Sequence, residues 1–290
     1  MADGLTDLPV AEEMLAAATT AGLDLASALS GDDEHLRPTD IAQPALLLVE
    51  SALRSALPAD LHVVAVAGHS VGEYAAAVAA GALRPADAMR VVIERGRAMA
   101  AMHDGTMCAL LGIDLDVATA VCEQAQRESG EVVVVANHNA PGQLVISGSR
   151  AGVDAAVALA LARGARRAIP LNVSGAFHSP LMASAASRFT VALDRVTLAD
   201  PDPPVVCNVD ARAVRSAAEL RDRLREQLTA PVRWIECVQR LVDLGAEALI
   251  EVGPGTVLSG LARRIAPGVR AIAVNTREAA ARIELAMVAP

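Results

Sequence analysis

The stretch around residue 70 places the strongest constraint on how this chain can fold. An apolar run, residues 61–67, leads directly into Gly68-His69-Ser70-Val71-Gly72, and small residues with helical spacing follow to residue 81. A short valine-rich run that ends at glycine is typical of a buried parallel strand. Strand, tight turn and helix form the context that a G-x-S-x-G nucleophile elbow needs, because the turn pushes the serine hydroxyl out of the fold. The pattern predicts an α/β fold with Ser70 as a nucleophile; the alternative is a tight turn in which Ser70 only caps the helix.

Residues 104–174 show a different pattern of predicted strands and helices. The predicted order is strand, helix, strand, strand, helix, strand, at residues 106–111, 117–126, 132–137, 143–148, 152–163 and 168–173. This β-α-β-β-α-β order is that of a ferredoxin-like unit. We therefore predict a ferredoxin-like subdomain, residues 104–174, inserted into a larger α/β-hydrolase-like domain with a parallel sheet, residues 1–103 and 175–290.

The larger domain is predicted to be mostly helical around a few short strands. Periodicity and capping residues indicate helices at residues 10–22, 39–57, 71–81, 85–102, 180–195, 217–228 and 234–244. Strands are predicted at residues 61–67, 205–207 and 248–252.

Composition and charge exclude several classes of protein. Hydrophobic residues make up 53% of the 290 residues and charged residues 20%, which excludes a disordered chain. The net charge of −9 argues against nucleic acid or an anionic membrane as the main partner. No apolar run reaches the roughly 18 residues of a membrane span, and no basic segment opens a signal peptide. The cysteines have no metal-ligand spacing and are expected to be buried thiols, so we expect a cytoplasmic protein. They are Cys108, Cys122, Cys207 and Cys237.

A serine nucleophile requires a base, and the histidines are the candidates. His178 lies in an irregular stretch between a predicted strand and a predicted helix, where site residues are common. His69 lies inside the elbow and is a candidate for lining the site. The alternative is that His178 is an ordinary loop histidine without a catalytic role. No acid between Ser70 and His178 stands out as the third member of a triad. The residues alone leave these alternatives open.

Six motifs together resemble one family. In chain order they are GHSVGEY at residues 68–74, RGR at 95–97, NHNAPGQ at 137–143, FHSPLM at 177–182, QL with PV at 227–228 and 231–232, and EVGPG at 251–255. This series resembles the malonyl-CoA:acyl carrier protein transacylase family of fatty acid biosynthesis, which includes the acyltransferase domains of polyketide biosynthesis. The resemblance extends from about residue 10 to residue 275.

The resemblance implies a role for each matched residue. Ser70 would carry the acyl group as an ester, and His178 would act as its base. A backbone carbonyl at Gln227 would orient the histidine in place of a carboxylate. Arg95 would pair with the free carboxylate of the malonyl group, a task that suits a guanidinium fork. The N–H of Val71 would be one oxyanion donor.

The resemblance also implies the substrate and the partners. Malonyl-preferring members tend to carry a bulky Phe immediately before the histidine, as Phe177 stands here, and a residue like Val71 after the serine. The expected reaction moves a malonyl group from malonyl-CoA to the phosphopantetheine thiol of an acyl carrier protein. It needs no metal and no tightly held cofactor.

One departure from the family leaves other functions open. Members open with a buried strand and a Gly-Gln-Gly type loop whose glutamine supplies a second oxyanion N–H, whereas this sequence begins at Met1 just before the first predicted helix. We expect that strand and loop to be absent, so that strand 61–67 lacks a neighbour and activity is impaired. This departure supports the alternative of a non-catalytic relative that only binds carrier protein. A second alternative is an acyl-thioester hydrolase, in which water replaces the carrier thiol, because the same nucleophile and base serve both reactions.

Overall fold

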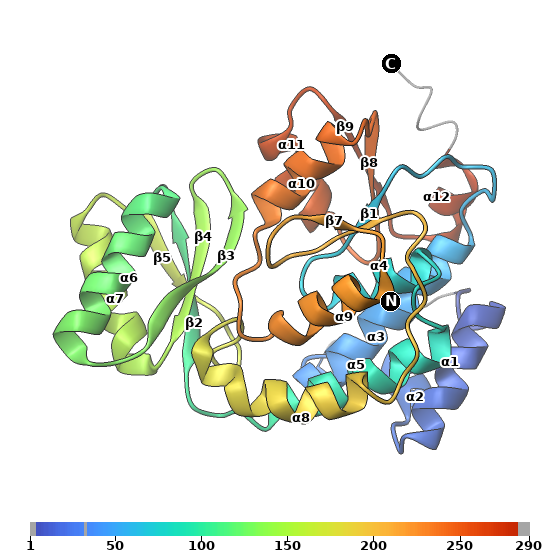
Figure 1. Ribbon diagram of the computed structural model, residues 1–290, viewed down its shortest axis with the longest axis horizontal. Coiled ribbons are helices and arrows are strands. Elements are labelled where there is room, and N and C mark those ends of the chain that lie inside the picture. The colour runs from blue at the N-terminus through green and yellow to red at the C-terminus, as the bar shows by residue number, and fades with distance from the viewer. Residues whose placement is uncertain (1–3, 32–33, 284–290) are drawn as a thin grey trace.

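The computed structural model describes residues 4–31 and 34–283, and Figure 1 shows a smaller part, in green, beside a larger one. The predicted α/β class is confirmed, because both parts contain helices and strands. Within the described residues, no helix has the length and apolar composition needed to cross a membrane. The family's first strand and loop were expected to be absent before the first helix, and residues 1–3 at this end of the sequence lie outside the described residues.

The smaller part is a four-stranded antiparallel sheet with two helices. Its elements are β2 (Thr106–Leu111), α6 (Leu115–Ser129), β3 (Val133–Ala140), β4 (Gln143–Gly148), α7 (Arg150–Ala162) and β5 (Arg167–Pro170). The strand order is β3-β4-β2-β5, and neighbouring strands run antiparallel. The two helices pack on each other and on the sheet around a core that includes Leu110, Ala125 and Ile146. This part has its own hydrophobic core, separate from that of the larger part.

The larger part consists of helices around short strands. Its first half holds α1 (Pro9–Thr20), α2 (Leu25–Ser30), α3 (Thr39–Ser55), β1 (Val66–Ala67), α4 (Gly72–Ala79) and α5 (Pro85–Ala100). Its second half holds η1 (Pro180–Met182), α8 (Ala183–Leu193), β6 (Val205–Val206), β7 (Ala213–Val214), α9 (Ala217–Glu226), α10 (Trp234–Asp243), β8 (Ala248–Val252), α11 (Val257–Ile265), β9 (Arg270–Val274) and α12 (Arg277–Ala281). Helix α5 packs on α1, α3 and α8, with Met89 and Ile93 fully buried one helical turn apart.

The strands of the larger part differ from the prediction. The predicted strand 61–67 is reduced to β1, because its parallel partner β6 is only two residues long and follows Pro203 and Pro204, which have no N–H for a ladder. Strand β7 pairs antiparallel with β6, and β8 pairs with β9 in a separate parallel sheet. The described residues of the larger part therefore form a mixed sheet and a parallel pair in place of the parallel sheet that was predicted. Five short elements, α2, β7, α11, β9 and α12, were not predicted.

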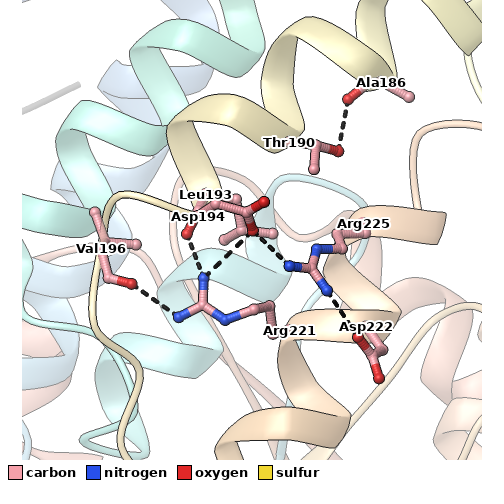
Figure 2. Close-up of polar contacts among 8 residues, drawn as sticks. All are labelled: Ala186, Thr190, Leu193, Asp194, Val196, Arg221, Asp222 and Arg225. Atoms are coloured by element: carbon pink, nitrogen blue, oxygen red, sulfur yellow. Dashed lines mark hydrogen bonds and ion pairs between the residues drawn. The ribbon is translucent and has the colours of Figure 1, made fainter.

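Helices α8 and α9 are joined by arginines (Figure 2). Arg221 donates to the backbone carbonyls of Leu193 and Val196, just where α8 ends, the second bond measuring 2.8 Å. Arg225 binds Asp194 at 2.6 Å. These contacts matter for the site because His178 lies shortly before α8 and Gln227 lies directly after α9.

A cavity of about 540 Å³ lies beside the elbow. It is lined mainly by apolar residues of segment 61–67, of α4, of α10 and of strand β8. Within the described residues, β1 pairs with β6 and with no other strand. Glu50 of α3 and Glu251 of β8 are carboxylates that line this cavity together.

Candidate active site

Ser70 lies at the tip of a tight turn between β1 and α4. Its backbone adopts a φ of 52°, a left-handed conformation that is strained for a residue with a side chain. The turn needs glycine at position 68, because a Cβ there would lie 1.9 Å from the carbonyl carbon of Gly72. The predicted nucleophile elbow is therefore the geometry that the chain adopts.

His178 contacts the serine directly. Its Nε2 lies 2.8 Å from Ser70 Oγ, and its Nδ1 lies 3.0 Å from the carbonyl oxygen of Gln227 and 3.2 Å from that of Ala230. Because carbonyl oxygens only accept hydrogen bonds, Nδ1 carries the proton and Nε2 is free to accept the serine proton. Burial, reinforced by the positive charge of Arg95, lowers the pKa of His178 to about 3.

Arg95 of α5 lies in the same site and is almost completely buried, at 1% exposure. Its Nη2 donates to Ser70 Oγ at 3.1 Å and to Oε1 of Gln227 at 3.0 Å. Its Nη1 donates to Oε1 of Gln43, and its guanidinium lies over the ring of Tyr74. Every direct hydrogen-bond partner of this cation among the described residues is neutral, so its charge is available to an anion.

The side chain of Gln227 connects these groups to the elbow backbone. Its Nε2 donates to the carbonyl oxygen of Ser70 at 3.0 Å and also to Oε2 of Glu73. Glu73 is fully buried, and burial raises its pKa to about 7. Gln227 thus contributes its backbone carbonyl to His178 and its side chain to Ser70, Arg95 and Glu73.

The remaining predicted residues lie around this group. His69 Nε2 bonds Oδ1 of Asn139 at 2.9 Å, and the His69 ring stands edge-on to that of Trp234. Phe177 precedes His178 and is 9% exposed. Among the described residues, none accepts a hydrogen bond from the N–H of Val71, so this donor is open at the start of α4.

The sequence predictions assigned no role to several side chains that contact the site, among them Gln43, Glu73 and Asn139. Gln43 lies in α3, far from any quoted motif, and only its contact with Arg95 reveals it. Glu73 and Asn139 lie inside the quoted motifs GHSVGEY and NHNAPGQ, so membership of a motif was the available signal. All three are polar groups whose partners come from distant segments of the chain.

This arrangement can perform acyl transfer through a serine ester. It contains a hydroxyl on a strained turn, a neutral base at hydrogen-bond distance, an open backbone donor, and a cation for an anionic substrate group. Across residues 4–31 and 34–283, no group of three His, Cys, Asp or Glu side chains is placed to hold a metal ion.

Comparison with known proteins identifies similar chains. A family described as "Acyl transferase domain" matches residues 9–277. The malonyl CoA-acyl carrier protein transacylase of Bacillus subtilis is 43% identical over 265 residues, covering 89% of this chain and 81% of that protein. An acyl-carrier-protein S-malonyltransferase from Burkholderia pseudomallei has a similar structure, with a TM-score of 0.89 at 37% identity over 98% of this chain and 94% of that chain. A solved complex of a type II PKS acyl-carrier protein with its malonyl-transacylase also matches, with a TM-score of 0.89 at 36% identity over 97% of this chain and 94% of that chain.

Proposed function

This chain belongs to the acyl transferase domain family, and from that membership we propose that it is an acyl carrier protein S-malonyltransferase. It moves a malonyl group from malonyl-CoA, through an ester on Ser70, to the phosphopantetheine thiol of an acyl carrier protein. The observation that carries the proposal is the contact of Ser70 Oγ with both the base His178, at 2.8 Å, and the cation Arg95, at 3.1 Å. The names of the relatives support the choice of malonyl-CoA and carrier protein.

In the first half-reaction Ser70 is acylated. His178 Nε2 takes the Ser70 proton while Oγ attacks the thioester carbonyl of malonyl-CoA. The N–H of Val71 donates to the oxyanion that forms. When the intermediate collapses, the carbon–sulfur bond breaks, and the leaving CoA thiolate receives the proton from the imidazolium.

The second half-reaction reverses these steps with a new thiol. The phosphopantetheine thiol of the carrier protein gives its proton to His178, and the thiolate attacks the Ser70 ester. The carbon–oxygen bond to Ser70 breaks, and Oγ takes the proton back from His178. The bonds from His178 Nδ1 to the carbonyls of Gln227 and Ala230 stabilise the imidazolium of each half-reaction, in the place where other serine enzymes use a carboxylate.

Arg95 and Phe177 select the acyl group. The buried guanidinium of Arg95 pairs with the free carboxylate of the malonyl group, which acetyl lacks. Phe177, next to the base, restricts the space for a branch on the acyl chain and so favours malonyl over methylmalonyl. His69, held by Asn139, forms a wall of the same site.

The domain assignment is part of the proposal. Residues 104–174 form a ferredoxin-like subdomain inserted into an α/β-hydrolase-like catalytic domain, residues 1–103 and 175–290. The strand order β3-β4-β2-β5 with two helices supports the first assignment, and the elbow between β1 and α4 supports the second. We place the activity in the cytoplasm, and the four buried cysteines, all free thiols, support this location.

Intact-mass analysis tests the proposal. After mixing with malonyl-CoA, the wild-type chain should gain one malonyl group, and Ser70→Ala should gain none. Addition of phosphopantetheinylated carrier protein should then remove the group from the enzyme and add it to the carrier. An adduct that water removes as fast as carrier protein would indicate a thioester hydrolase, and the absence of any wild-type adduct or turnover would contradict enzymatic function.

A further inference from the structure

Asn208 has two hydrogen bonds to the backbone of the nucleophile elbow. It follows β6 by two residues and is fully buried. Its Oδ1 accepts a hydrogen bond from the N–H of Ser70 at 2.8 Å, and its Nδ2 donates to the carbonyl oxygen of Gly68 at 2.7 Å. One side-chain amide therefore binds the chain on both sides of His69.

The chemistry of an amide explains why asparagine suits this position. The parallel ladder between β1 and β6 ends at Ala67 and Val206, where the chain turns sharply into the elbow. A primary amide offers one acceptor and donors in one plane, as a backbone peptide group does. The Asn208 side chain therefore takes the place of the next rung of the ladder, beyond the point where the backbone of β6 can pair.

Asn208 is itself held from two sides. Its N–H donates to Oε1 of Glu73 at 3.3 Å, and its carbonyl oxygen accepts from the N–H of Arg233 at 3.0 Å. A residue with so many fixed contacts can hold a strained neighbour in place, and Ser70 has the strained φ of 52°.

We propose that Asn208 is a positioning residue: its side-chain amide holds the strained backbone of Ser70 so that Oγ points at His178 Nε2. This inference rests on the proposed function and deepens it. The Ser70 N–H is already bound and is not available to the oxyanion, whereas the N–H of Val71 has no acceptor among the described residues.

Two substitutions at position 208 test the proposal. Asn208→Leu keeps the branched shape of the side chain and removes both side-chain hydrogen bonds to the elbow. Asn208→Asp keeps the acceptor for Ser70 but, when ionised, places a carboxylate against the carbonyl of Gly68. Val214→Ala on β7 is the matched control, because it removes buried methyl groups from the same small sheet without touching the elbow.

The measured quantity is the rate constant for labelling of Ser70 by a fluorophosphonate, followed by intact mass. This reagent phosphonylates an activated serine with loss of fluoride and does not depend on the natural acyl donor. Displacement of a reacting group by about 1 Å can cost about 100-fold in rate. We expect Asn208→Leu to slow labelling by roughly 10- to 100-fold, and to lower kcat for malonyl transfer with little change in the KM for malonyl-CoA. The control should label at the wild-type rate.

The Asn208→Asp variant should show a pH-dependent labelling rate, which a nonspecific loss of structure around residue 208 would not produce. When its new carboxyl group is protonated, that group can again accept from Ser70 and donate to Gly68, so the labelling rate relative to wild type should rise as the pH is lowered from 8 to 5. The titratable groups that face position 208 are Glu73 of α4, Cys237 of α10 and the neighbouring Cys207. Glu73 is ionised above its pKa of about 7, and there its negative charge favours the protonated form of the new carboxyl.

Each outcome decides the question. Labelling of Asn208→Leu at the wild-type rate, or equal slowing in Val214→Ala, would overturn the positioning role. If Asn208→Leu does not fold, the pH dependence of Asn208→Asp decides, and a flat ratio overturns the role. A wild-type chain that reacts with the fluorophosphonate but not with malonyl-CoA would refute the proposed function alone, and one that reacts with neither would refute both.

Discussion

At the level of single residues, the site places a buried cation beside a histidine that stays neutral. Arg95 and His178 both contact Ser70 Oγ, and the positive charge of Arg95 adds to the effect of burial in lowering the pKa of the histidine. Neutral amide oxygens from Gln43 and Gln227 hold the guanidinium without cancelling its charge. The site can therefore bind an anionic acyl group and accept a proton from Ser70 at the same time.

Replacing Arg95 should change the choice of acyl group. In Arg95→Ala a bound malonyl carboxylate loses a charged partner, which costs about 1.5–3 kcal/mol, whereas acetyl loses no such contact. We expect kcat/KM for malonyl-CoA to fall by roughly 10- to 100-fold more than kcat/KM for acetyl-CoA. Arg90→Ala, an exposed arginine on the same helix, is the control and should leave both values unchanged. Equal losses for the two substrates would remove Arg95 from the acyl pocket.

The low pKa of His178 has a consequence for the pH dependence of acylation. With a pKa of about 3, the imidazole is neutral throughout the range from about pH 5 to 8, and the rate of Ser70 acylation should be flat there. Lowering the pH should reduce the rate only as the imidazole becomes protonated. Arg95→Ala removes a positive neighbour, so the fall should then begin at a higher pH. Rapid-quench mass spectrometry measures this profile, and a wild-type inflection near the ordinary histidine pKa of about 6.5 would contradict the prediction.

Among the elements, the pairing of α8 with α9 brings the base and its carbonyl partner together. His178 precedes α8 and Gln227 follows α9, so the relative placement of the two helices sets the distance of 3.0 Å between Nδ1 and the Gln227 oxygen. The arginines of Figure 2 bind α9 to the C-terminal end of α8. Arg221 and Arg225 differ in their partners and in their exposure, so their contributions to stability should differ.

Loss of Arg221 should cost more stability than loss of Arg225. Arg221 satisfies two backbone carbonyls, which Arg221→Ala leaves without their charged donor at a cost of about 1–3 kcal/mol. Arg225 makes more exposed ion pairs of the kind that contribute about 0–1 kcal/mol. We expect Arg221→Ala to lower the Tm by several degrees, at about 2–4 °C per kcal/mol, and Arg225→Ala to serve as the milder control. Equal shifts in calorimetry would show that the carbonyl contacts are unimportant.

In the molecule as a whole, a large unfilled volume lies beside the elbow. The cavity of about 540 Å³ between segment 61–67 and β8 is mainly apolar, and Glu50 lies at its wall near Gly253 and Glu251. Burial, together with the charge of Glu251, raises the pKa of Glu50 to about 8. The folded chain therefore retains a proton that the unfolded chain, with an ordinary carboxyl pKa near 4.5, releases.

This raised pKa predicts a loss of stability with rising pH. Below about pH 4.5 Glu50 is protonated in both states and has no effect; between about 4.5 and 8 the folded state binds more protons, so its stability falls as the pH rises. Glu50→Gln should remove this loss and be more stable than wild type at about pH 9, with no difference at about pH 4. A gain of about 2 kcal/mol would raise the Tm by about 4–8 °C.

Thermal unfolding at both pH values measures the effect. Glu12→Gln, at an exposed position of α1, is the control and should change the Tm little at either pH. A Glu50→Gln variant that is no more stable than wild type at the higher pH would contradict the protonated state of the half-buried Glu50.

Local sequence by itself determined most helices, the strands of the smaller part, and the elbow. Strands 106–111, 143–148 and 248–252 were predicted with their observed bounds, because alternation and flanking turns are properties of consecutive residues. The elbow was predictable for the same reason: Gly68 permits the close turn, and Ser70 stands between a strand and a helix. Sequence also singled out Ser70, His178, Arg95 and Gln227 through a resemblance of motifs.

Only the tertiary structure decided which side chains meet at the serine and how far the strands extend. Gln43, Asn208 and Glu73 come from three different elements or loops, and no local pattern states that their amide and carboxyl groups converge. Segment 61–67 is apolar over most of its length, yet it pairs over only two residues. Its partner β6, a distant segment, is itself only two residues long. Both features depend on hydrogen-bond partners that are remote in sequence. A polar group in the interior must be hydrogen-bonded, and the packing of the whole chain determines which partner lies within reach.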